Sequence, residues 1–221
     1  MLFRSMPAAA EPAPATDPKL HLRWLAVVVF ALGLALAGWQ VWRDRTPGLR
    51  HPATLSTAWV SFALWAGAVG LMIPAKPHEW TPIATRFRVA GWTWVLGLLM
   101  FVVHLGVAFH FGHGWSHDHA LRHVQETAGW GPGLFVSYTF AVVWAADVVW
   151  LILSPASYAT RRPWVGWAVH GFLAFVTFNG TVVYVPNAMR WVAAGVFAVL
   201  AGAMLWRALA SRAPSGVGSN S

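Results

Sequence analysis

Residues 133–153 read GLFVSYTFAVVWAADVVWLIL, an apolar run whose one charged side chain is Asp147. A helix needs about 20 apolar residues to cross the hydrocarbon core of a lipid bilayer. A soluble domain of this size has a single core, which does not hide several runs of such length. The stretch therefore predicts a membrane-spanning helix.

Runs of similar length and character recur through the chain. Hydrophobic residues make up 57% of the 221 residues, charged residues make up 10%, and the mean hydropathy of +0.55 lies outside the range of soluble proteins. The apolar segments lie at residues 22–42, 55–73, 91–111, 133–153, 164–184 and 191–209. The predicted fold is an all-α, polytopic membrane protein with a six-transmembrane-helix bundle and a short extramembrane helix between spans three and four.

The domain organisation follows from the same segments. Residues 21–210 form the predicted membrane domain, and residues 1–20 and 211–221 are predicted to be disordered cytoplasmic tails. A small-residue site at Ala35-Leu36-Ala37 leaves open that the first span is a cleaved signal peptide. The apolar run continues to Trp42, which favours a signal anchor.

The basic residues predict the orientation of the bundle, because cytoplasmic loops carry an excess of Lys and Arg. Those on the side of the amino terminus are Arg4, Lys19, Arg23, Lys76, Arg86, Arg88, Arg161, Arg162, Arg207 and Arg212, and those on the other side are Arg43, Arg45, Arg50, Arg122 and Arg190. The bias predicts that both termini are cytoplasmic. With no cysteine and no targeting motif, a bacterial inner membrane is the expected compartment.

Composition also excludes several classes of function. The net charge of +8 does not indicate a nucleic-acid partner, because the basic residues lie in short segments between the spans. The absence of cysteine excludes disulfides, thiolate nucleophiles and Cys-based metal sites. No phosphate-binding loop, nucleophile elbow or pair of carboxylates supports the mechanism of a soluble enzyme.

The most unusual feature is a concentration of histidines at the outer end of the third span and in the loop after it. These are His110, His113, His117, His119 and His123, followed by Glu126. Imidazole is the commonest metal ligand and coordinates at neutral pH without a thiolate, so the pattern indicates Zn²⁺ or Cu²⁺. The alternative is a solvated loop whose imidazoles make ordinary hydrogen bonds.

Two ligand sets fit this segment. If Ser116 caps a short helix that Gly129 ends, His119, His123 and Glu126 share one helix face at positions i, i+4 and i+7. That set resembles a zinc site with an open position.

The second set requires the third span to continue past Gly112 and Gly114, which places His110, His113 and His117 on one side of a helix. If the helix instead ends at these glycines, the chain can turn and bring one further imidazole to the first set. The predicted metal-ligating residues are His113, His117, His119, His123 and Glu126.

A second feature lies within the spans. A charged side chain is costly in a bilayer, so Asp147 is expected to face the bundle interior and to have a partner. Asp147 and His170 lie at similar depths, roughly 10 and 9 Å from the cytoplasmic ends of consecutive spans. They are therefore predicted to form an intramembrane polar pair, in direct contact or through one water.

His104 lies nearer the outer half of its span, with Tyr138 and Asn179 at depths that allow them to meet it. His104 and His170 differ in depth by roughly 10 Å, which disfavours haem held by two histidines.

Three functions stay open at this level. The first is a membrane protein that binds a transition metal through the histidine-rich outer loop. The second is a non-catalytic structural or assembly subunit that packs against other membrane proteins, favoured by the small-residue stripe Ala194/Ala198/Gly202. The third is a proton-coupled carrier that uses Asp147 and His170. No motif indicates an enzyme.

Overall fold

A computed structural model describes residues 19–75, 81 and 84–211, with the side chains of residues 19–22 left out. Apart from residues 19, 20 and 211, the predicted tails lie outside the described residues. The described chain is helical and contains no strand. Its elements are α1 (Lys19–Arg43), α2 (Pro52–Met72), α3 (Thr85–Val107), η2 (Ala108–Gly112), α4 (His117–Ala128), α5 (Gly133–Leu153), α6 (Pro155–Ala159), α7 (Pro163–Phe178), η3 (Asn179–Val183) and α8 (Met189–Ala210).

Six of these helical segments are long and apolar enough to cross a membrane, which confirms the predicted number. They are α1, α2, α3 with its π-helical extension η2, α5, α7 with its π-helical extension η3, and α8. The predicted bounds of α5 match the structure, whereas α3 begins earlier than predicted, at Thr85. Proline occupies the first helical position of α2, α6 and α7, where its missing N–H is tolerated.

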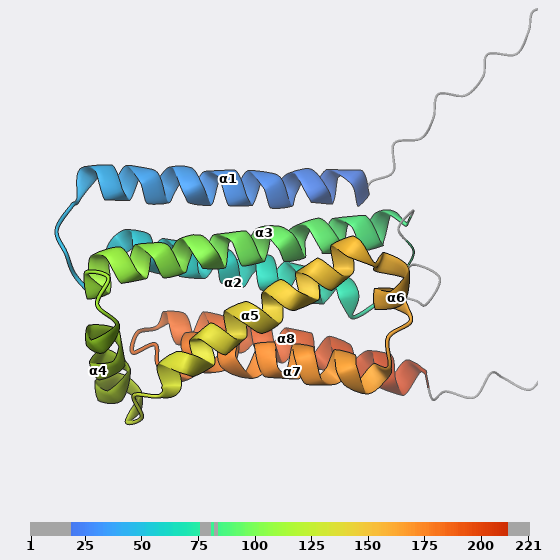
Figure 1. Cartoon of the computed structure of the whole chain (residues 1–221). Helices are drawn as coiled ribbons and strands as arrows, with labels where there is room; N and C mark the ends of the chain where they lie inside the picture. Colours follow the sequence, from blue (N-terminus) through green and yellow to red (C-terminus); the bar gives the residue numbers. More distant parts are fainter. Residues whose placement is uncertain (1–18, 76–80, 82–83, 212–221) are drawn as a thin grey trace, which may run out of the picture.

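The six helices run alternately between the two ends of an elongated bundle (Figure 1). The start of α1, the end of α8 and the short helix α6 lie at one end, which we call the terminal end. The short helix α4 lies at the other, the far end. Since the six segments alternate in direction, residues close to the terminal end come from both halves of the sequence.

The predicted short helix between spans three and four is confirmed as α4. The Ser116 Oγ accepts a hydrogen bond from the His119 backbone N–H at 3.2 Å, and Gly129 ends the helix with a φ of 74°. Before it, Gly114 and Trp115 have φ values of 55° and 60°, so the chain turns sharply after η2. The third span therefore does not continue as one helix through His117.

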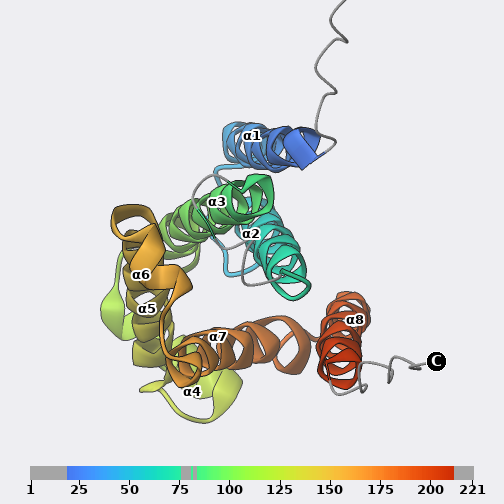
Figure 2. The ribbon, with the colours of Figure 1, turned by 90° about the vertical axis from the view of Figure 1, so that its right-hand side faces the viewer.

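Viewed along the bundle, α2, α3, α5, α7 and α8 are arranged in a ring, and α1 packs outside against α2 and α3 (Figure 2). The core between them is rich in tryptophan, with Trp94 and Trp144 almost fully buried. Close helix approach occurs at Gly97, where an added Cβ would lie 3.0 Å from the Trp144 ring. In the predicted α8 stripe, Ala194 packs against the core, whereas Ala198 is exposed and an added Cβ at Gly202 would meet nothing within 4 Å, so the second half of the stripe faces outward.

Candidate functional site

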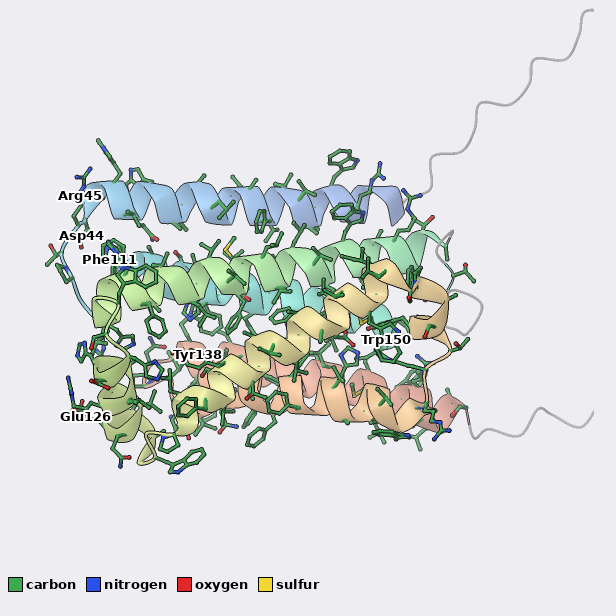
Figure 3. All side chains as sticks on the ribbon, in the orientation of Figure 1. Asp44, Arg45, Phe111, Glu126, Tyr138 and Trp150 are labelled. Carbon is green, nitrogen blue, oxygen red and sulfur yellow. The ribbon has the colours of Figure 1, made fainter. Side chains whose placement is uncertain are left out.

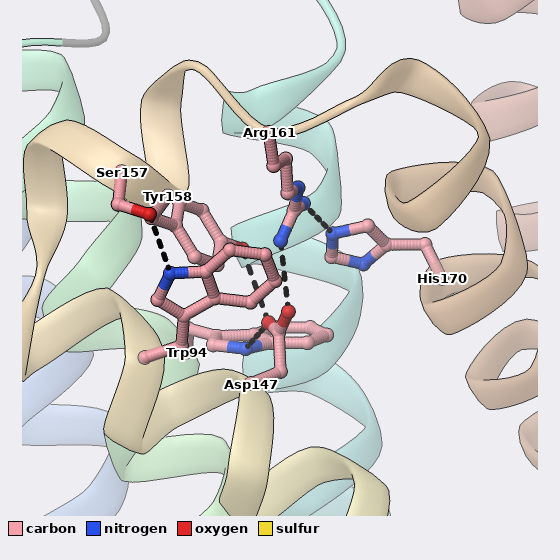
Figure 4. Close-up of polar contacts among 7 residues, drawn as sticks. Trp94, Asp147, Ser157, Tyr158, Arg161 and His170 are labelled. Atoms are coloured by element: carbon pink, nitrogen blue, oxygen red, sulfur yellow. Dashed lines mark hydrogen bonds and ion pairs between the residues drawn. The ribbon is translucent and has the colours of Figure 1, made fainter.

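The carboxylate of Asp147 is the centre of a buried polar network near the terminal end (Figure 4). Its Oδ2 accepts hydrogen bonds from Trp94 Nε1 and the Tyr158 hydroxyl, both at 3.0 Å. Its Oδ1 accepts from Arg161 Nη1 at 2.9 Å, which is also an ion pair. The side chain of Asp147 is 1% exposed, so these three donors take the place of the water molecules that burial removes from the carboxylate.

Arg161 connects this carboxylate to α7. Its second nitrogen, Nη2, lies 2.9 Å from His170 Nε2, and its guanidinium lies 3.8 Å from the centroid of the Tyr158 ring. A guanidinium only donates hydrogen bonds, so Nε2 of His170 must accept. The imidazole of His170 is therefore neutral in this arrangement, with its proton on Nδ1.

The predicted pair of Asp147 and His170 thus meets through a third side chain. Arg161 lies between them, and it donates to both. From the sequence, Arg161 is predicted only to be one of the basic residues on the cytoplasmic side. One feature of the sequence could have indicated the role of Arg161. It lies two residues before the proline that begins α7, in a loop so short that the Arg161 side chain stays close to the end of the bundle.

Tyr158 supports the same carboxylate from the short helix α6. It is 1% exposed. Burial, and next the nearby Asp147 carboxylate, raises the pKa of its hydroxyl well above the ordinary value. The hydroxyl therefore stays protonated and remains a donor at physiological pH.

A cavity of about 570 Å³ opens beside this network. Its polar lining includes Arg161, His170 and Arg207, and its apolar lining includes Met72, Trp167 and Met204. These side chains come from α2, α7, α8 and the loop after α6. We call this space the terminal cavity. Its volume is in the range of pockets that hold small organic molecules.

The charges around the terminal cavity do not cancel. Asp147 neutralises Arg161. Arg207 donates a hydrogen bond to the Ile73 carbonyl oxygen, and among the described residues no carboxylate pairs with it. With His170 neutral, the described side chains leave about one positive charge at the cavity.

The predicted neighbours of His104 are not its partners. His104 Nδ1 lies 3.0 Å from the Thr54 carbonyl oxygen of α2. Tyr138 instead contacts His117 Nδ1 through its hydroxyl at 3.1 Å, and the Asn179 amide donates to the Phe175 carbonyl oxygen. The reason is that depth along a span does not fix the direction in which a side chain points.

The predicted outer ligand set is only partly brought together. The ring centroids of His119 and His123 lie 5.4 and 5.6 Å from that of His113. His117 points away to Tyr138, and Glu126 is exposed on α4, at the end of the molecule where Figure 3 labels it. Among the described residues, no three His, Asp or Glu side chains form a group that could hold a metal ion as they stand.

Comparison with known proteins adds no relative. No protein-family model, curated protein or solved structure matches the chain. The described residues form a helical bundle with six helices of membrane-spanning length, a buried Asp–Arg–His network and a cationic cavity beside it.

Proposed function

We propose that this chain is a multi-pass protein of the bacterial inner membrane that binds an anionic amphiphile in the terminal cavity. The observation that carries the proposal is the cavity itself, which combines an apolar wall with Arg161, His170 and Arg207. A few convergent polar groups in a mostly apolar pocket are typical of binding sites for small organic molecules.

The negative charge of the proposed ligand follows from the positive charge on the cavity wall. Arg207 is the cation that no described carboxylate neutralises, and it lines the cavity. A carboxylate or phosphate monoester carries the complementary charge and accepts charge-assisted hydrogen bonds from a guanidinium. Arg161 is committed to Asp147 and His170, so its role is to hold the wall in place.

The apolar part of the ligand follows from the rest of the wall. Met72, Trp167 and Met204 offer flexible and aromatic apolar surface next to the cations. In a bilayer, the terminal end of the bundle would lie near the headgroups, where arginines and tryptophans are favoured. A single-chain molecule with one anionic head fits such a site better than a compact, fully polar anion.

Two other functions remain open on the sequence evidence. A proton-coupled carrier would use Asp147, but its carboxylate is already held by three donors. A structural subunit would need a partner surface, and the exposed Ala198 and Gly202 of α8 are compatible with one. The cavity favours neither of these functions.

Photo-crosslinking tests the proposal. The full chain, in nanodiscs of zwitterionic lipid, is exposed to a fatty acid that carries a diazirine in its tail, and labelled peptides are mapped. We expect labelling of the α7 and α8 peptides that contain Trp167 and Met204. Parallel arms use the matching alkyl phosphate, the uncharged alcohol, and inorganic phosphate as a competitor.

The matched variants are Arg207→Gln at the cavity and Arg190→Gln at the far end of the same helix. Loss of a charge-assisted hydrogen bond is expected to weaken binding by about tenfold in the first and to leave it unchanged in the second. Equal labelling by the acid and the alcohol, or equal labelling in both variants, would reject the anionic site. Competition by inorganic phosphate alone would mean that a free anion, and not an amphiphile, is bound.

A further inference from the structure

The hydrogen bonds of the histidines separate them into two groups. The chain has ten histidines, and the structure describes the side chains of eight, since His21 and His78 lie outside. Five of the eight use a ring nitrogen in a hydrogen bond: His51, His104, His110, His117 and His170. Within the described residues, the rings of His113, His119 and His123 make none.

These three histidines, which we call the histidine trio, are also the ones that cluster. His113 follows η2, while His119 and His123 lie one turn apart on α4. The ring of His113 contacts both of the others, at centroid distances of 5.4 Å from His119 and 5.6 Å from His123. Imidazoles that share one zinc ion through bonds of 2.0–2.1 Å have centroids about 5 Å apart. The two pairs that His113 forms therefore have nearly the spacing of imidazoles on a shared metal ion.

His113 adds an observation that does not depend on these distances. Its Nδ1 is buried and has no hydrogen-bond partner among the described residues. A buried polar atom without a partner costs free energy, and native proteins rarely retain one without a reason. A metal ion that accepts the lone pair of this nitrogen would remove the cost.

We infer that the histidine trio binds one divalent transition-metal ion, Zn²⁺ or Cu²⁺, at the far end of the bundle. As they stand, the three rings do not form a metal site, so binding requires ring rotation. His119 is exposed and His123 is half-buried, so both rings can turn between staggered conformations at low cost. Three imidazoles leave a fourth position for water, as in zinc sites with an open position.

This set differs from the one that the sequence predicts. His117 is not part of the trio, because its ring contacts Phe135 and Tyr138 and not His113. Glu126 is exposed and belongs to no group that could hold a metal. The inference is also independent of the terminal cavity, which lies at the opposite end of the bundle.

Zinc titration of the full chain tests the inference. The protein is purified through a tag that contains no histidine, stripped with a chelator and titrated with Zn²⁺ alone in competition with a chromophoric chelator. We expect one Zn²⁺ per chain with a micromolar or lower Kd. Changing His119 or His123 to Ala should weaken binding by roughly a hundredfold or more, because each supplies a ligand.

The matched controls are His110→Ala, His117→Ala and Glu126→Gln, which alter the same segment outside the trio. They should leave the zinc affinity within about threefold of the original, since their side chains are hydrogen-bonded elsewhere or exposed. Gel filtration checks that every variant remains folded. The inference is overturned if no stoichiometric zinc binds, or if His117→Ala or Glu126→Gln weakens binding as much as His119→Ala does.

Discussion

Asp147 shows how one residue can fix several elements. Its carboxylate receives hydrogen bonds from α3, α6 and the loop between α6 and α7. Each donor satisfies part of a charge that would otherwise be costly to bury. Removing the charge of Asp147 leaves the largely buried Arg161 without its counter-ion. This unpaired cation costs more free energy than the lost attraction itself.

Asp147→Asn should therefore lower the free energy of unfolding by about 3–5 kcal/mol, the usual cost of removing one partner of a buried ion pair. Denaturation of the detergent-solubilised protein, followed by circular dichroism, measures it. Asp44→Asn is the control, because Asp44 lies half-buried in the α1–α2 loop and its carboxylate accepts only a local hydrogen bond from the Thr46 N–H. A similar loss in both variants would contradict the role given to Asp147.

His113 makes a residue-scale prediction about pH. Burial lowers the pKa of its imidazole from the ordinary value of 6.5, and the neighbouring His123 and His119 lower it further. The unfolded chain then takes up this proton at higher pH than the folded chain does. The stability linked to His113 is fully present above about pH 6.5 and is lost as the pH falls from there through the folded pKa.

His113→Gln should therefore make stability less dependent on pH between about 7.5 and 5. The measurement is the denaturation midpoint against pH, in the presence of a chelator. His110→Gln serves as the control, since the His110 ring lies in the same segment but accepts a hydrogen bond from Trp115. Parallel curves for the original chain and His113→Gln would exclude this linkage.

At the scale of elements, α3 and α5 approach closely because Gly97 has no side chain. An added Cβ there would lie 3.0 Å from Cζ2 of Trp144 and 3.4 Å from Cβ of Leu64. Both neighbours are buried in the core, with Trp144 only 1% exposed, so neither side chain has space to move aside.

Gly97→Ala should thus destabilise the bundle by about 1–3 kcal/mol, the usual cost of overpacking. Gly106→Ala is the control on the same helical span, where an added Cβ meets nothing within 4 Å. Alanine is a better helix former than glycine, so the control should be neutral or stabilising. Unfolding of the two variants under identical conditions separates the effect of core packing from that of helix propensity. Equal denaturation midpoints would exclude a clash between the added Cβ and Trp144.

The elements were largely predictable from sequence, whereas the site was predictable only in part. Hydropathy and capping preference are local properties of the sequence, so the six helices follow from the first and the caps of α4 at Ser116 and Gly129 from the second. The network does not, because Arg161 reaches Asp147 only after α6 has turned the chain back. His113 joins the trio for a similar reason, through the turn at Gly114.

At the scale of the whole molecule, the even number of spans places the start of α1 and the end of α8 at one end of the bundle (Figure 1). That end also carries the described basic residues Arg86, Arg88, Arg161, Arg162 and Arg207. Basic loops are retained on the cytoplasmic side during insertion. The terminal cavity should then open toward the cytoplasmic leaflet, and α4 with the histidine trio should face the opposite side.

The absence of cysteine allows this orientation to be measured directly, since a single introduced cysteine is the one reactive thiol in the chain. Thr160→Cys marks the terminal end, and Gln125→Cys marks α4 at the far end; both positions are exposed. In intact bacterial cells whose outer membrane has been made permeable, a membrane-impermeant maleimide should label Gln125→Cys and not Thr160→Cys. Lysis should make both positions reactive, which controls for burial of the thiol. Labelling of Thr160→Cys alone before lysis would reverse the orientation, and would place the terminal cavity on the outer side, because the two ends are joined by helices long enough to cross the membrane.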